Sequence, residues 1–133
     1  MDAKDKEYFL NNNILNKSRI FTTNVAGITY IPKYKETMLY LLNYNQNGYK
    51  IPIILKREKD NKYDSNAIMV CTRIKNKDLK LGYIPKKWNE ILVYVLDNKD
   101  KYKVLTSSAK ITGGVDGKEN FGIVFDYKIV KLS

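Results

Sequence analysis

The last part of the chain carries the sequence pattern that most constrains its fold. Between residues 121 and 131 apolar and polar side chains alternate, with apolar residues at Phe121, Ile123, Phe125, Tyr127 and Ile129. Successive side chains of a β-strand point to opposite faces, so this alternation indicates a strand with one buried face. The chain must therefore supply a sheet and a core against which this strand can pack.

Further strands are predicted from shorter β-rich runs separated by turn-forming residues. With the last run, they cover residues 19–30, 37–44, 49–56, 67–74, 79–84, 102–112 and 121–131. The sequence Asn45-Gln46-Asn47-Gly48 indicates a turn, because Asn-Gly accepts positive φ. Gly113-Gly114 and Asp116-Gly117 mark the loop before the last run. Pro52 predicts an edge strand or a bulge in the third run.

One segment has helical periodicity. Trp88, Ile91, Leu92 and Val95 recur at spacings of three and four residues, which places them on one face of a helix over residues 86–97. We expect this face, including Trp88, to pack in the core. Pro85 is suited to the start of such a helix because it lacks a backbone N–H.

These elements predict one mainly β domain over residues 19–133. The expected architecture is a small, OB-like, partly open β-barrel of about six or seven strands with the amphipathic helix 86–97. A chain of 133 residues suits one such domain. Residues 1–18 are expected to form a weakly ordered N-terminal arm, in which Asn11-Asn12-Asn13 interrupts a single helical turn.

Charge favours a polyanionic partner but does not assign a function. The formal net charge is +10, which favours nucleic acid first and anionic membrane second. Its arginines are only Arg19, Arg57 and Arg73, and a lysine-rich composition is also typical of AT-rich genomes.

Missing residue types exclude much chemistry. The chain has no histidine, which excludes Ser-His and Cys-His catalytic pairs. Its single cysteine, Cys71, excludes an internal disulfide and a Cys/His zinc site. We therefore expect no enzyme activity, no cofactor and no bound metal. No signal peptide or apolar run of transmembrane length is apparent, so we expect no membrane partner and a cytoplasmic location.

A polar loop between two apolar runs carries the most specific motif. Arg57-Glu58 ends the first run, and Tyr63-Asp64-Ser65-Asn66-Ala67-Ile68 opens the second. The segment Val25-Ala26-Gly27-Ile28-Thr29-Tyr30 precedes them, and Leu81-Gly82-Tyr83-Ile84-Pro85-Lys86 follows and leads into the predicted helix. In this order the motifs resemble the HIRAN family over roughly residues 25–97, with residues 25–30 as its first strand.

The resemblance implies an OB-like barrel that binds DNA. In fork-remodelling helicases such a domain captures the 3′-hydroxyl end of a single strand, so single-stranded DNA is the implied partner. By motif position, Tyr30 and Tyr63 would stack on bases, Asp64 would accept a hydrogen bond from the terminal hydroxyl, and Lys86 would contact a phosphate. Tyr83 stands where other members often have histidine. The family's Arg-Tyr-Tyr motif reads Thr29-Tyr30-Ile31 here.

The residues themselves leave alternatives open at several of these positions. Asp64 and Asn66 flank a strand start, where such side chains often bond the local backbone. Tyr63 follows five polar residues, so we expect its ring outside the core, as stacking requires. Arg57 pairs with Glu58 or Asp64, or contacts a phosphate. The candidate interface residues are Tyr30, Arg57, Tyr63, Asp64, Asn66, Tyr83 and Lys86.

Three functional classes remain. The first is a nucleic-acid-binding module, with a partner protein supplying any motor or nuclease activity. The second is a protein-interaction accessory module of a phage or mobile element, which would show an exposed apolar patch. The third is a metal-dependent nuclease, which would need converging carboxylates, of which Asp60 and Asp64 are the nearest pair. Convergence of the tyrosines and Lys86 on one open, positive surface would favour the first.

Overall fold

The computed structural model describes residues 1–114 and 120–132, and for Trp88 it describes the backbone alone. The described strands are β1 (Ile20–Asn24), β2 (Ile54–Arg57), β3 (Ile68–Ile74), β4 (Lys77–Tyr83), β5 (Tyr102–Thr106), β6 (Lys110–Gly113) and β7 (Phe121–Lys131). The α-helices are α1 (Ala3–Leu10), α2 (Tyr34–Gln46) and α3 (Asn89–Asp97). Shorter helical turns are η1 (Asn11–Leu15), η2 (Ile28–Tyr30) and η3 (Lys86–Trp88). The predicted mainly β fold is confirmed.

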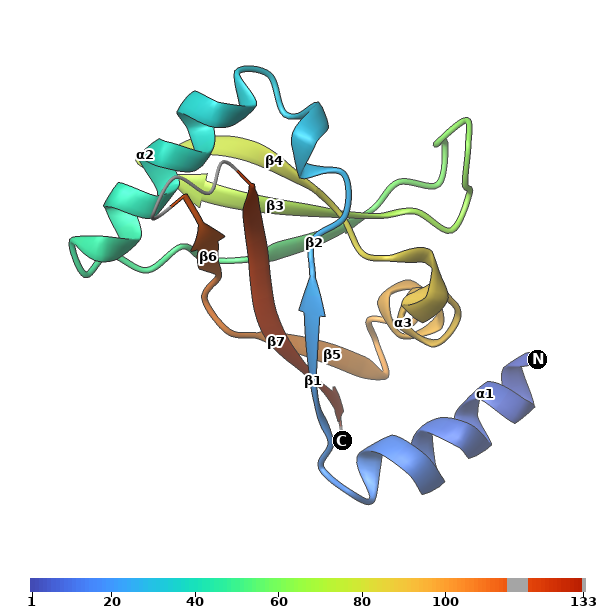
Figure 1. Cartoon of the computed structure of the whole chain (residues 1–133). Helices are drawn as coiled ribbons and strands as arrows, with labels where there is room; N and C mark the ends of the chain where they lie inside the picture. Colours follow the sequence, from blue (N-terminus) through green and yellow to red (C-terminus); the bar gives the residue numbers. More distant parts are fainter. Residues whose placement is uncertain (115–119, 133) are drawn as a thin grey trace.

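The strands form two antiparallel sheets (Figure 1). In the larger sheet β7 lies between β1 and β5 and also pairs with β6, whereas the smaller sheet has the order β2-β3-β4. The predicted strand over residues 121–131 is confirmed as β7, and its inward residues Ile123, Phe125, Tyr127 and Ile129 are buried. This long strand organises the larger sheet because β1, β5 and β6 all pair with it.

The two sheets are not closed into a barrel within the described residues. Two isolated bridges join them instead, Ala26 with Tyr83 and Ile51 with Ala109. One core fills the space between the sheets, with Ile68 and Leu81 from the smaller sheet and Ile123 from the larger one all fully buried. The bridge at Tyr83 fixes the segment before η2 against the end of β4.

The predicted strand over residues 37–44 is wrong, because this segment forms α2. Met38 and Leu41 are the fully buried residues of this helix, and their spacing of three matches a helix. The alternating residues Met38, Tyr40, Leu42 and Tyr44 suggested a strand, but Tyr40 is exposed. Of the turn predicted over residues 45–48, Asn45 and Gln46 still belong to α2, and the chain turns at Asn47 and Gly48, where Gly48 has a φ of +86°.

The extents of three other predicted strands are corrected. The run 19–30 contains β1, but its extended conformation ends where Gly27 takes a left-handed φ of +75° before η2. The run expected over 102–112 is two strands, β5 and β6, separated near Ser107, whose N–H donates to Asp126 O at 2.8 Å. In the run 49–56 the strand proper begins only at Ile54, after Pro52, and forms a sheet edge as Pro52 predicted.

The prediction for the N-terminal arm needs the largest correction. Residues 3–15 are helical instead of weakly ordered, because Leu10 and Ile14 insert their side chains into the core. The hydroxyl of Tyr94 on α3 donates to Glu7 on α1 at 2.8 Å, so this hydrogen bond links the two helices. The same bond is the main reason why the pKa of Tyr94 is raised to about 12. The predicted division between residues 18 and 19 stays a prediction. Figure 1 shows α1 and α2 at opposite ends of the molecule.

The predicted amphipathic helix is confirmed as η3 followed by α3. Leu92 and Val95 are buried and Ile91 is half-buried, as their spacing predicted. The side chain of Trp88 and the turn predicted at Asp116-Gly117 lie outside the described residues. None of the helices in the described part of the chain combines the length and apolar character that a membrane span needs.

Candidate nucleic-acid interface

An open groove with a volume of about 830 Å³ lies between three segments of the chain. The first segment is residues 26–32 around η2, and the second is the loop of residues 61–67. The third runs from Lys80 on β4 through Lys86 to Asn89 at the start of α3. A volume of this size is in the range of sites that bind small ligands or single nucleotide units.

Two tyrosines on different walls of the groove are almost fully exposed. Tyr30 is 90% exposed at the end of η2, and Tyr63 is 92% exposed in the loop. Exposing a large aromatic ring to water gives up the free energy that its burial would supply. Rings left exposed in this way are available to stack on a flat ligand. The prediction that Tyr63 lies outside the core is confirmed.

The wall that carries Tyr30 is fixed by a close approach of two backbones. Tyr83 and Ala26 exchange two backbone hydrogen bonds, of 2.9 and 2.8 Å. A Cβ atom at Gly82 would lie 2.2 Å from the carbonyl oxygen of Ala26, so a larger residue would push the two segments apart. Glycine at this position therefore sets the distance between η2 and β4, and with it the position of Tyr30.

Two side chains shape the loop that carries Tyr63. The Asn61 side-chain oxygen accepts the N–H groups of Tyr63 and Asp64, both at 2.9 Å. Asp64 Oδ1 in turn accepts the N–H of Asn66 at 2.9 Å, so its predicted bond to the local backbone is present. Such Asx turns hold a loop in one conformation without regular secondary structure. Asp64 also lines the groove, which leaves it available to a ligand.

A chain of hydrogen bonds crosses the groove wall at Tyr83. Lys80 Nζ donates to the Tyr83 hydroxyl at 2.6 Å, and this hydroxyl donates to Glu58 Oε1 at 2.8 Å. The same Glu58 oxygen accepts from the Asn61 amide at 2.6 Å. The Lys80 ammonium also lies 4.5 Å from the centre of the Tyr83 ring. Tyr83 therefore holds Lys80 in place.

Both charged ends of this chain keep their charge at neutral pH. The hydrogen bond to Tyr83 is the main reason why the pKa of Lys80 lies above its ordinary value. The amide of Asn61, followed by the hydroxyl of Tyr83, holds the pKa of Glu58 below its ordinary value. Lys80 thus presents a fixed positive charge to the groove, near the exposed Lys86.

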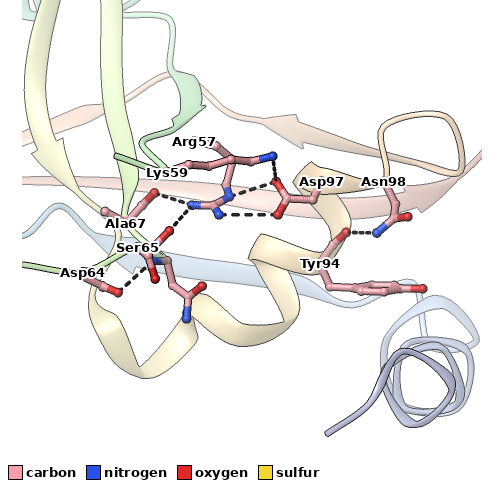
Figure 2. Close-up of polar contacts among 9 residues, drawn as sticks. Arg57, Lys59, Asp64, Ser65, Ala67, Tyr94, Asp97 and Asn98 are labelled. Atoms are coloured by element: carbon pink, nitrogen blue, oxygen red, sulfur yellow. Dashed lines mark hydrogen bonds and ion pairs between the residues drawn. The ribbon is translucent and has the colours of Figure 1, made fainter. Parts of the chain in front are cut away.

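Arg57 lies behind the loop and not in the groove. Its guanidinium donates to Asp97 at 3.0 and 3.5 Å, and to the carbonyl oxygens of Ser65 and Ala67 at 3.2 and 2.9 Å (Figure 2). The predicted pairing with Glu58 or Asp64 is therefore wrong, because the end of α3 brings Asp97 closer. Arg57 connects the loop to α3.

We expect Arg57→Ala to lower the free energy of unfolding by about 1–3 kcal/mol, because Asp97 loses its guanidinium partner and the carbonyl oxygens of Ser65 and Ala67 each lose a donor. Arg73→Ala is the matched control. Arg73 makes an exposed ion pair with Asp78 at 3.7 Å, and its loss should cost about 0–1 kcal/mol. Urea denaturation of both variants measures the difference. Equal losses would show that the bonds of Arg57 do not stabilise the loop.

Five of the seven predicted interface residues meet at the groove: Tyr30, Tyr63, Asp64, Tyr83 and Lys86. Arg57 and Asn66 do not line it, although the exposed Asn66 belongs to the loop of residues 61–67. Lys80 and Asn89 also line the groove and were not predicted from the sequence. Lys80 precedes the buried Leu81 on β4, so strand alternation points it away from the core. Asn89 is a polar residue three positions before the buried Leu92, which is the signal that could have found it.

Comparison with known proteins places this arrangement in a family. The family model described as HIRAN domain matches residues 19–112, which is more than half of the chain. The chain belongs to the HIRAN family. HIRAN domains are nucleic-acid-binding modules, so the groove lies in a domain of a nucleic-acid-binding family.

A solved structure supports the HIRAN fold. The crystal structure of the HIRAN domain of human HLTF has a TM-score of 0.50 to this chain, with 18% sequence identity. The match covers 83% of this chain and 74% of that chain. At this identity the likeness is one of fold. No curated protein sequence matches this chain.

Proposed function

We propose that this HIRAN domain binds single-stranded DNA in the groove and takes the 3′-hydroxyl end of the strand between Tyr63 and Asp64. The observation that carries the proposal is the exposure of Tyr30 and Tyr63, 90% and 92%, on two different segments that line one groove. Bases inside a duplex are already stacked on their neighbours, so exposed rings of this kind favour the bases of a single strand or an unpaired end.

The charges around the rings fit the backbone of such a strand. Lys80 and Lys86 line the groove, and the exposed Lys33 and Lys62 are sequence neighbours of lining residues. Lysine ammonium groups neutralise phosphates and release their counterions, which drives binding. Tyr83 contributes by holding Lys80, since one face of its ring already lies against that ammonium.

Asp64 is the one carboxylate that lines the groove among the described residues. An ionised carboxylate only accepts hydrogen bonds, so it favours a hydroxyl donor and repels a phosphate. This chemistry supports binding of a free 3′-hydroxyl end over a 3′-phosphate end or a continuous strand. The proposal gives the chain no chemical step of its own. Among the described residues no three carboxylate or thiol groups lie together as metal ligands do, so no observation favours the nuclease alternative.

We expect binding to weaken steeply with salt. Each phosphate neutralised on a single strand contributes a log–log slope of roughly −0.7, so two to four lysine contacts give a slope of roughly −1.4 to −2.8. Fluorescence anisotropy of a short labelled single strand, measured from low to moderate salt, tests this. Lys86→Gln should reduce the slope by about 0.7, whereas Lys103→Gln, on the exposed side of β5, should leave it unchanged. Absence of binding at low salt would overturn the proposal.

A further inference from the structure

Asn89 is a buried polar residue at the edge of the groove. It is the first residue of α3, it is only 5% exposed, and it lines the groove behind Asp64. Its side-chain Nδ2 donates to Asp64 Oδ2 at 3.3 Å, while its Oδ1 is buried without a hydrogen-bond partner among the described residues. A buried acceptor without a partner destabilises the folded state. An apolar side chain of similar size at this position would therefore give a more stable folded state than asparagine does.

The orientation of the Asn89 side-chain amide follows from its contact with Asp64. Turning the amide by half a rotation would place Asn89 Oδ1 against Asp64 Oδ2, which brings together two groups that only accept hydrogen bonds. The buried atom without a hydrogen-bond partner would then be the amide nitrogen instead of the oxygen. The orientation that donates to Asp64 is therefore the favourable one, and its unpaired oxygen is the consequence.

We propose that Asn89 is a positioning residue that sets the selectivity of the groove for a hydroxyl group by holding the carboxylate of Asp64. The proposal rests on the proposed reading of a 3′-hydroxyl end by Asp64. The N–H of Asn66 holds Oδ1 and the amide of Asn89 holds Oδ2, so both carboxylate oxygens are fixed in direction. A carboxylate oxygen accepts more than one hydrogen bond, so Oδ2 keeps capacity for a ligand hydroxyl.

This role predicts that stability and selectivity change in opposite directions. Leucine has the branched shape of asparagine without its polar atoms, so Asn89→Leu removes the unpaired oxygen. The variant should melt a few degrees higher than the parent chain. It should also lose on the order of tenfold in its preference for a 3′-hydroxyl strand over a 3′-phosphate strand. A residue needed only for the fold would lose stability on this change.

Thr72→Val provides the matched control. The Thr72 hydroxyl is the other buried side-chain atom without a partner among the described residues, and it lies on β3, outside the groove lining. Valine has the same shape, so this variant should also gain stability. Its preference for the 3′-hydroxyl strand should equal that of the parent chain. The comparison separates removal of an unpaired buried atom from loss of the contact with Asp64.

The test is competition anisotropy with 3′-hydroxyl and 3′-phosphate forms of one short single strand, together with thermal melting. Asn89→Ala is measured in parallel, in case leucine does not fit. In the Asp64→Asn background, Asn89→Leu should have no further effect on the preference, because it acts through Asp64. A full preference in both Asn89 variants would overturn this inference alone. A parent chain without any preference would overturn both this inference and the reading of a 3′-hydroxyl end.

Discussion

Tyr30→Ala and Tyr63→Ala are each expected to weaken binding of a short single strand by about 1–3 kcal/mol, or roughly fivefold to 150-fold. Each ring lies on its own wall of the groove and is nearly free of contacts within the protein. Loss of either ring therefore removes a stacking surface and takes little from the fold. The double variant should lose most of the affinity that stacking supplies and keep mainly the electrostatic affinity that the lysines supply.

Tyr8→Ala is the control for these two changes. Tyr8 is 71% exposed on α1, but it does not line the groove, so its replacement should leave the affinity unchanged. Tyr30→Phe and Tyr63→Phe should bind nearly as well as the parent chain, because stacking needs the ring and not the hydroxyl. Anisotropy with a labelled strand measures all six variants, the double variant included. If the Tyr8 change costs as much as the groove changes, the groove tyrosines do not act by stacking.

Asp64→Asn is expected to abolish the preference for a 3′-hydroxyl end, which we put at about 1–3 kcal/mol relative to a 3′-phosphate end. Asparagine keeps an oxygen for the N–H of Asn66, so the loop conformation should be retained. What the change removes is the negative charge that repels a phosphate and strengthens the bond to a hydroxyl.

Competition among 3′-hydroxyl, 3′-phosphate and circular strands tests this prediction. The parent chain should favour the 3′-hydroxyl strand, and Asp64→Asn should bind the hydroxyl and phosphate forms with similar affinity. Asp78→Asn serves as the control, since Asp78 lies on β4 outside the groove lining. Equal affinity of the parent chain for all three strands would show that it does not read ends, even if it binds single strands.

The sequence predicted the fold best where burial alone decides the local structure. Strand β7 alternates because one of its faces packs in the core, and α3 follows the spacing of Leu92 and Val95. Helix α2 was missed because Met38 and Leu42 fit both a strand and a helix, and only tertiary packing decides between them. Helix α1 was missed because its stability comes from Leu10 in the core.

The candidate site was also predicted only in part, because some of its features depend on local sequence and others on tertiary contacts. Polar neighbours in the sequence were enough to place the ring of Tyr63 outside the core. In contrast, the partners of Arg57 and Asn89 come from elements far apart in the sequence, Asp97 on α3 and Asp64 in the loop. Local pattern carries no information about such contacts, because they depend on how α3 packs against the loop.

The most direct measurement is an NMR titration that maps where a short single strand with a 3′-hydroxyl end contacts the domain. If the groove is the interface, the largest changes in backbone amide shifts will fall in residues 26–32, 61–67 and 80–89. Helix α2 and the turn after it, with the exposed Tyr40 and Tyr49, should change little. Changes centred on α2 with none in the three groove segments would contradict the assignment of the groove as the nucleic-acid interface.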